Sequence, residues 1–222
     1  THAIESLTAI PYYQRPAPEN PGLRPPYQGA NPISDVWAAR AIEMVGKNII
    51  RVADGTADDE ARTQMLLAAT FAGIGFGNAG CHLPHAMSYP VAAMVHSYVP
   101  EGYPAQHRLI PHGMAVTLTA PAAFRFTAQA NPDRHLYCAR LMGVDTSRAG
   151  RDDAGELLAS ALADLMRRTG MPNGLGAVGY GPGDVDQMVA GVLPQERIWK
   201  LSPRPVTVED FKRILLDSMR FW

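Results

Sequence analysis

The sequence predicts an all-α fold, and three features of the chain lead to that prediction. Apolar side chains recur at helical spacing in several segments, most clearly between residues 34 and 54. Residues that favour helix starts precede some of these segments, such as Thr207 with Asp210 three positions later. The chain shows no internal repeat and no alternation of strands and helices of the kind that builds a parallel sheet. We therefore expect helices joined by loops.

Size and composition are those of a globular protein. The chain has 222 residues, of which 46% are hydrophobic and 18% charged, and this excludes a disordered tail. Twenty Lys and Arg against 21 Asp and Glu give a formal net charge of −1, so no net field attracts nucleic acid or an anionic membrane. No stretch reaches the roughly 18 apolar residues of a transmembrane helix. Neither nucleic acid nor a membrane is an expected partner.

The two cysteines, Cys81 and Cys138, are too few for a disulfide scaffold and fit a reducing compartment. We expect two ordinary buried thiols in a cytoplasmic protein, or in a protein of the mitochondrial matrix if the source is a eukaryote.

The first third of the chain divides into a loop and two long helices. Residues 11–32 contain seven prolines and predict an extended surface loop. A helix is expected over 34–54, capped by Ser34. The next is expected to begin at Thr56 and to run to Gly80. Because its later half is rich in Ala and Gly, another backbone can approach it closely, and we expect it in the centre of the domain.

The rest of the chain predicts shorter helices. A segment over 81–97 contains Pro90 as a kink or stop, and residues 99–111 read as a loop. Residues 114–130 fit both a strand and a helix, and their length favours a helix. Further helices are expected over 132–142, over 151–169, from Asp184 to Gly191 after a glycine-rich turn at 174–183, and from Thr207 onward.

Common cofactor and nucleophile motifs are missing from the sequence. The run from Gly73 to Gly77 lacks the G-x-G-x-x-G spacing, and no predicted strand precedes it, so it does not indicate nucleotide binding. Walker, G-x-S-x-G and C-x-x-C motifs are absent as well.

Histidines are the residues most suited to chemistry. His82 and His85 are three apart and share a helix face, while His112 stands between Pro111 and Gly113, where a loop turns into a helix. Imidazoles suit iron, zinc, copper or nickel, and such a site needs three or four converging ligands. The spacing alone leaves open both a metal site and ordinary surface or core histidines.

Three motifs in order resemble those of the iron-containing (group III) alcohol dehydrogenases. The run from Glu60 to Pro90, with Gly73-x-Gly75-Phe76-x-Asn78-Ala79-Gly80-x-x-x-x-His85-Ala86-Met87-Ser88-Tyr89-Pro90 as its second half, resembles one family signature. Pro111-His112-Gly113 resembles a second signature, and Thr1-His2-Ala3-Ile4-Glu5 matches the end of an earlier one. The resemblance extends over essentially the whole chain. Within the family it is strongest to the hydroxyacid–oxoacid transhydrogenase branch, through Tyr89, the 85–112 spacing, Ser34-Asp35-Val36-Trp37 and Pro194-Gln195-Glu196-Arg197.

This resemblance implies a particular domain. The family joins an N-terminal α/β domain that binds NAD(P) to an all-helical C-terminal domain. Residues 1–222 are then a single helical metal-binding domain, the C-terminal bundle of the dehydroquinate synthase-like or iron-containing alcohol dehydrogenase fold. The nucleotide-binding domain is absent from the sequence.

The resemblance also implies the site. It makes His2, His85 and His112 the ligands of Fe²⁺ or Zn²⁺, with His85 and His112 as the catalytic positions. The fourth ligand of the family, an aspartate, falls before Thr1. His82 is expected to point away from the site, His107 is either a pocket residue or an exposed loop residue, and Tyr89 is expected to form a pocket wall. The residues that would bind NAD(P) are unknown.

The implied function is the metal-binding catalytic half of an NAD(P)-dependent alcohol or hydroxyacid dehydrogenase. Hydride would leave a metal-bound alkoxide for the nicotinamide, and the fragment by itself would be inactive. We expect a small alcohol or hydroxyacid as substrate and a homo-oligomer. One alternative is a non-catalytic helical interaction module. Another is lyase chemistry of the dehydroquinate synthase type, against which the 60–90 signature and Pro111-His112-Gly113 argue.

Overall fold

The computed structural model describes residues 1–56 and 58–222, and within these ranges it is helical without a β-strand. Short 3₁₀ turns and one isolated bridge between Pro11 and Ala30 complete the backbone. The helices are α1 (His2–Thr8), α2 (Pro32–Ala53), α3 (Asp59–Ala79), α4 (Leu83–Ala93), α5 (His112–Thr117), α6 (Ala120–Thr127), α7 (Pro132–Leu141), α8 (Ala154–Arg168), α9 (Val185–Val192), α10 (Glu196–Trp199) and α11 (Val208–Asp217). The prediction of an all-α fold is confirmed.

Capping explains where the predicted helix starts hold and where they fail. The capping box before α11 is confirmed, because the backbone NH of Asp210 donates to Thr207 Oγ1 at 3.2 Å. The start of α2 was placed too late, since Asn31 and not Ser34 is its cap and accepts from the Ser34 NH at 3.1 Å. Helix α3 begins after Asp58 and not at Thr56, which binds Asp54 instead. The predicted range 56–80 includes residue 57, which lies outside the described residues.

Prolines shape the middle of the chain. The contested segment 114–130 is helical, but it is divided into α5 and α6 because Pro121 has no NH to continue the helical hydrogen bonds. Pro90, in contrast, lies inside α4, which continues for three residues and ends at Ala93, short of the predicted residue 97.

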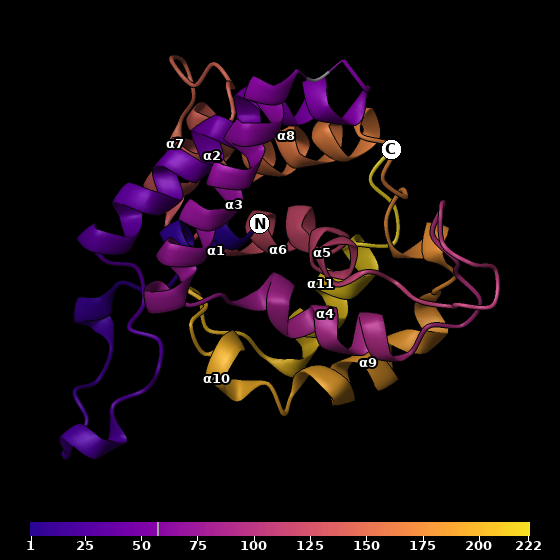
Figure 1. The fold of residues 1–222 in the computed structure, drawn as a ribbon. Helices are drawn as coiled ribbons and strands as arrows, with labels where there is room; N and C mark the ends of the chain where they lie inside the picture. Colours follow the sequence, from indigo (N-terminus) through magenta and orange to yellow (C-terminus); the bar gives the residue numbers. More distant parts are fainter. Residues whose placement is uncertain (57) are drawn as a thin grey trace.

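Two hydrophobic clusters divide the molecule. The first is formed by α1, α2, α6, α7 and α8 and includes Leu7, Phe124 and Leu158. The second is formed mainly by α4, α5, α6, α9 and α11 and includes Met87 and Phe211. Figure 1 shows α2, α3, α7 and α8 on one side and α4, α9, α10 and α11 on the other, with α1, α5 and α6 between them. Helix α6 contributes to both clusters, so it links the two sides.

The prediction that α3 occupies the centre of the domain is wrong. Its small side chains serve one close contact with α2, where a Cβ added to Gly75 would lie 3.3 Å from the Ala38 Cβ. The opposite face is exposed, with Leu66 at 72% and Ile74 at 46% of full exposure. Helix α3 packs against α2 and α1 on one side and is exposed on the other, so it lies at the edge of the domain.

Gly80 turns the chain sharply between α3 and α4. Its φ of 90° is favourable only for glycine, and a Cβ there would lie 2.4 Å from Leu201 Cδ1. The two helices meet at 107°. Among the described residues no single helix is long and apolar enough to cross a membrane, although this bent pair together reaches the required length and composition.

Other local predictions hold. Residues 11–32 form a largely exposed loop with only two 3₁₀ turns, at Tyr12–Gln14 and Pro21–Leu23, as their proline content predicts. Cys81 and Cys138 are both buried and free.

The cap at Asn31 can be tested against a second asparagine. Replacing Asn31 with Ala should lower the free energy of unfolding by about 0.5–2 kcal/mol, because the first turn of α2 loses its side-chain acceptor. Asn131 precedes α7 but makes no side-chain cap, so Asn131→Ala should cost less. Urea denaturation of both variants measures the difference, and equal losses would contradict the assignment.

Candidate metal centre

A buried carboxylate joins α1 to the start of α4. Glu5 is 0% exposed, and its Oε1 accepts the backbone NH groups of His82 at 2.9 Å and His85 at 3.2 Å. These NH groups belong to the first turn of α4, where the helix provides them with no acceptor and the helix dipole favours negative charge. Glu5 therefore caps α4 from another helix.

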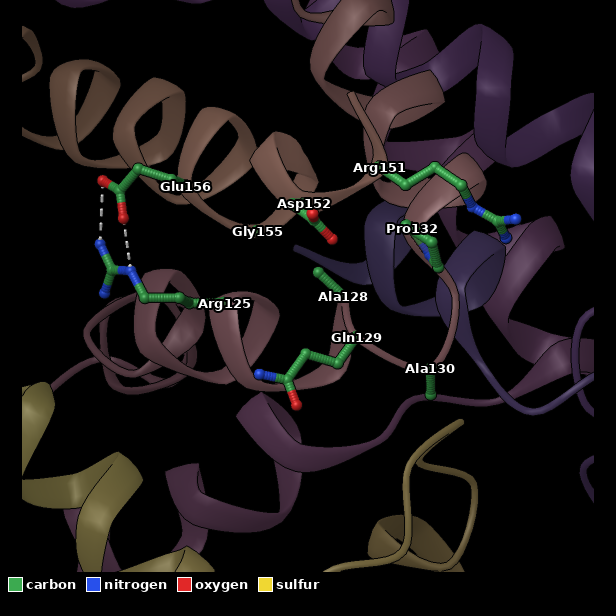
Figure 2. A pocket seen from close by; sticks show the side chains of 9 residues that line it. All are labelled: Arg125, Ala128, Gln129, Ala130, Pro132, Arg151, Asp152, Gly155 and Glu156. Atoms are coloured by element: carbon green, nitrogen blue, oxygen red, sulfur yellow. Dashed lines mark hydrogen bonds and ion pairs between the residues drawn. The ribbon is translucent and has the colours of Figure 1, made fainter. Parts of the chain in front are cut away.

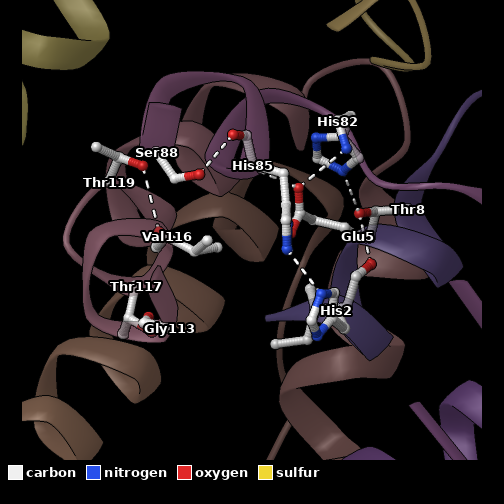
Figure 3. Close-up of polar contacts among 11 residues, drawn as sticks. His2, Glu5, Thr8, His82, His85, Ser88, Gly113, Val116, Thr117 and Thr119 are labelled. Atoms are coloured by element: carbon white, nitrogen blue, oxygen red, sulfur yellow. Dashed lines mark hydrogen bonds and ion pairs between the residues drawn. The ribbon is translucent and has the colours of Figure 1, made fainter. Parts of the chain in front are cut away.

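The same carboxylate orients His85. Glu5 Oε2 accepts a short hydrogen bond from His85 Nδ1, so the other ring nitrogen, Nε2, is the atom that could bind a metal ion. That Nε2 lies 2.8 Å from Nε2 of His2, and the two rings stack at a centroid distance of 4.3 Å. Figure 3 shows the two imidazoles meeting, with Glu5 behind His85. A carboxylate behind a ligating histidine is a common arrangement at metal sites.

His112 approaches the same place from α5. It is the first residue of that helix, is exposed, and its ring centroid lies 5.4 Å from that of His85. The structure thus brings together the three histidines that the sequence singled out, although two of them are 83 positions apart. Their role as metal ligands stays a prediction.

The electrostatics keep the ligand atoms available. Burial, together with the neighbouring His85, lowers the pKa of His2 to about 4, so its ring is neutral at neutral pH, as a metal ligand must be. Burial by itself would raise the pKa of Glu5, but the charge and hydrogen bond of His85 and the contact with His82 outweigh it and lower the pKa to about 2. Glu5 is therefore ionised.

Two residues near the centre were missed by the sequence analysis. Glu5 follows His2 by three positions on α1, and this i, i+3 spacing was the available signal. Cys81, expected to be an ordinary buried thiol, offers an Sγ that lies within 4.8 Å of ligand-capable nitrogens of His2 and His85. His112 does not belong to this tightest group. Burial raises the pKa of the Cys81 thiol, so the free side chain is neutral.

The remaining candidates lie away from the three histidines or at their edge. His82 points elsewhere, as expected: the Thr8 hydroxyl donates to the carbonyl of Ile4, and Thr8 Oγ1 accepts from His82 Nε2 at 2.9 Å. His107 lies in an exposed loop. Tyr89 lies one turn beyond His85 on α4 and is exposed.

A surface hollow between α6 and α8 is separate from the histidines. Figure 2 shows this cavity of about 600 Å³, which includes Arg125, Gln129, Arg151 and Glu156 in its lining. Its arginines are already paired, Arg125 with Glu156 at 2.7 Å and Arg151 with Asp133 at 3.0 Å. The two arginines of the hollow are therefore engaged by carboxylates and are not free to bind an anionic ligand.

Comparison with known proteins identifies the family. The model of the Fe-containing alcohol dehydrogenase family, C-terminal, matches residues 27–219. The chain belongs to this family. It is 52% identical over 223 residues to the "Probable hydroxyacid-oxoacid transhydrogenase, mitochondrial" of Dictyostelium discoideum. This alignment covers 100% of the chain and 41% of that protein. It is 48% identical over 222 residues to the "Hydroxyacid-oxoacid transhydrogenase, mitochondrial" of Bos taurus, covering 100% of the chain and 48% of that protein. The chain thus spans less than half the length of these relatives.

Solved structures of the family share the fold. An alcohol dehydrogenase from Oenococcus oeni superposes with a TM-score of 0.78 at 27% identity, over 98% of this chain and 48% of that one. A 1,3-propanediol oxidoreductase gives a TM-score of 0.79 at 24% identity, over 98% of this chain and 49% of that one. The predicted resemblance to the helical domain of the family is confirmed.

Buried histidines predict a loss of stability in acid. Burial lowers the pKa of both His82 and His135 to about 4, from 6.5. The unfolded chain then binds more protons between these two pH values, so stability is complete above about pH 6.5 and falls as the pH drops toward 4. His135→Gln should flatten this fall by up to about 1.4 kcal/mol per pH unit.

Urea titrations at pH 7, 6, 5 and 4 measure this dependence. The exposed His107 provides the matched control, since His107→Gln should leave the slope unchanged. An unaltered slope in His135→Gln would show that His135 is not neutral in the folded protein.

Proposed function

We propose that this chain is the metal-binding catalytic half of a dehydrogenase that acts on alcohols or hydroxyacids. The supporting observation is the convergence of His2, His85 and His112, with the ionised Glu5 holding His85 in one tautomer. Three neutral imidazoles are a donor set that fits Fe²⁺ or Zn²⁺.

The residues divide the work between them. His2, His85 and His112 would hold the ion, and Glu5 would keep the Nε2 lone pair of His85 directed at it. A divalent ion bound there lowers the pKa of a substrate hydroxyl and stabilises negative charge on its oxygen. The exposure of His112 on α5 leaves this side of the centre open to a small molecule.

The hydride acceptor would come from the other half of the parent protein. The sequence contains no dinucleotide motif, and the relatives are about twice as long as this chain. NAD(P) bound by a preceding domain would take the hydride, so the isolated chain would be inactive. The relatives' names favour a hydroxyacid that loses hydride and a proton to become an oxoacid, while a second oxoacid gains them. Their names also favour a mitochondrial location.

Loss of any imidazole tests the ligand set. His2→Ala, His85→Ala and His112→Ala should each reduce the metal content of purified, Fe²⁺- or Zn²⁺-loaded protein, because a two-histidine site holds such ions weakly. Elemental analysis after dialysis measures it, with the exposed loop variant His107→Ala as the control that keeps wild-type content. Unchanged metal content in the first three variants would refute the assignment.

The same experiment distinguishes the proposed dehydrogenase half from the alternative, a non-catalytic helical interaction module. If the unaltered 222-residue chain retains no metal, the non-catalytic helical module becomes the better interpretation. Reproducible NAD-dependent oxidation of an alcohol by this chain would reject both that module and the proposed inactivity of the isolated half.

Glu5 can be tested without removing a ligand. Glu5→Gln keeps the shape but loses the charge that holds His85 Nδ1–H, so metal affinity should fall about 10- to 100-fold. Competition with a chromophoric chelator measures the affinity. Glu43→Gln is the control, because Glu43 is a half-buried carboxylate of α2 that pairs with Arg40 and Lys47 and not with a histidine. An affinity equal to that of the unaltered chain would exclude Glu5 from the centre.

A further inference from the structure

Cys81 is the buried nucleophile that the proposed function leaves unused. It stands between Gly80 and His82, in a part of the family signature where the matching residues are unspecified, so the signature does not account for it. Its side chain is buried, and no hydrogen bond to its thiol is found within residues 1–56 and 58–222. A free sulfur beside two imidazoles is a potential ligand and more than a space-filling group.

We propose that Cys81 Sγ is a ligand of the divalent ion held by His2 and His85, and that it makes this centre favour Zn²⁺ over Fe²⁺. This inference rests on the proposed metal site and names a further ligand for it. The geometry that carries it is the mutual distance of the three ligand-capable atoms, all within 4.8 Å.

The distances suit a shared ion after a small adjustment. Zn–S bonds are about 2.3 Å and Zn–N bonds about 2.0–2.1 Å, so ligands of one tetrahedral ion lie about 3.3–3.7 Å apart. The three ligand-capable atoms lie within 4.8 Å of one another, so side-chain movements on the order of 1 Å would bring the sulfur and the nitrogens to these separations. The two histidine nitrogens, at 2.8 Å, are closer than this range, so they would move slightly apart to share one ion.

The sharp turn at Gly80 positions this sulfur. Because α3 ends there and α4 begins at Leu83, Cys81 lies in the connection, opposite α1 and its His2. Glu5 is excluded from the same compact group, since it is directed at His85 Nδ1 and the start of α4. The carboxylate and the thiol therefore have different roles: Glu5 orients His85, and Cys81 faces the ion.

Coordination would change both charge and selectivity. Binding would form a sulfur–metal bond and release the thiol proton to solvent, so one thiolate beside the neutral imidazoles would leave a net charge of +1 on the centre. Thiolate is a soft ligand that favours Zn²⁺ or Co²⁺ over Fe²⁺.

Cobalt provides a direct test, because a thiolate–Co²⁺ bond absorbs in the near ultraviolet whereas imidazole–Co²⁺ bonds do not. Anaerobic titration of the 222-residue chain with Co²⁺ should produce this charge-transfer band at one equivalent. Cys81→Ala and the closer mimic Cys81→Ser should lose it. Cys138→Ala, which removes the other buried thiol, should retain it.

The outcomes separate this inference from the proposed function. Co²⁺ binding that depends on His2 and His85 but shows no such band would overturn the role of Cys81 and leave the histidine site intact. A band that persists in Cys81→Ser would overturn it as well. If no Co²⁺ binds at all, the metal site itself fails, and the proposal for Cys81 fails with it.

Competition between Zn²⁺ and Fe²⁺ tests the proposed preference for zinc. With equal Zn²⁺ and Fe²⁺ under anaerobic conditions, the unaltered chain should take up mostly Zn²⁺, and Cys81→Ser should lose part of that preference. Identical Zn²⁺ to Fe²⁺ ratios in the two proteins would contradict the selectivity.

Discussion

The buried carboxylate of Glu5 is the interaction on which the site depends. Burying a charged group away from water costs free energy unless the group is paired and hydrogen-bonded. Glu5 meets this condition through two backbone NH groups at the start of α4 and the ring of His85. The groups lie 77 and 80 positions away in the sequence. Satisfying one charge therefore fixes α1 against α4 and directs His85 toward His2.

The position of the site follows from the two hydrophobic clusters. Helix α1 belongs to the first cluster through Ile4 and Leu7, whereas α4 belongs to the second through Leu83 and Met87. The imidazoles meet where the two clusters adjoin, so both must be folded before the ligand atoms are in place. Helix α6, which contributes to both, couples the two sides. The histidine cluster is therefore buried at Glu5 and His85 and exposed at His112.

The donor set combines hard and soft character. Imidazoles can bind several transition metals, the carboxylate of Glu5 orients His85, and the sulfur of Cys81 lies within 4.8 Å of nitrogens of His2 and His85. These side chains come from three segments of the chain, α1, the connection before α4 and α4 itself. The chain spans less than half the length of the relatives, so the proposed hydride acceptor would belong to the part of the protein outside these 222 residues.

The sequence by itself determined the helices and the family. Periodicity located the helical segments, and the Thr207–Asp210 pair located the start of α11, because these signals are local. The histidines were assigned to a metal site through the resemblance to family motifs, because their spacing alone favoured ordinary surface or core histidines. Helix starts at Asn31 and Asp58 were missed because several residues in each neighbourhood can cap, and the sequence does not rank them.

Only the tertiary structure decided what each side chain faces. It placed α3 at the edge, because the close approach at Gly75 occurs on one side of the helix and periodicity cannot count neighbours. It also gave Glu5 and Cys81 their places, since a carboxylate and a thiol in a local pattern carry no information about partners some 80 residues away. Such contacts arise from how the two hydrophobic clusters pack, which is a property of the whole chain.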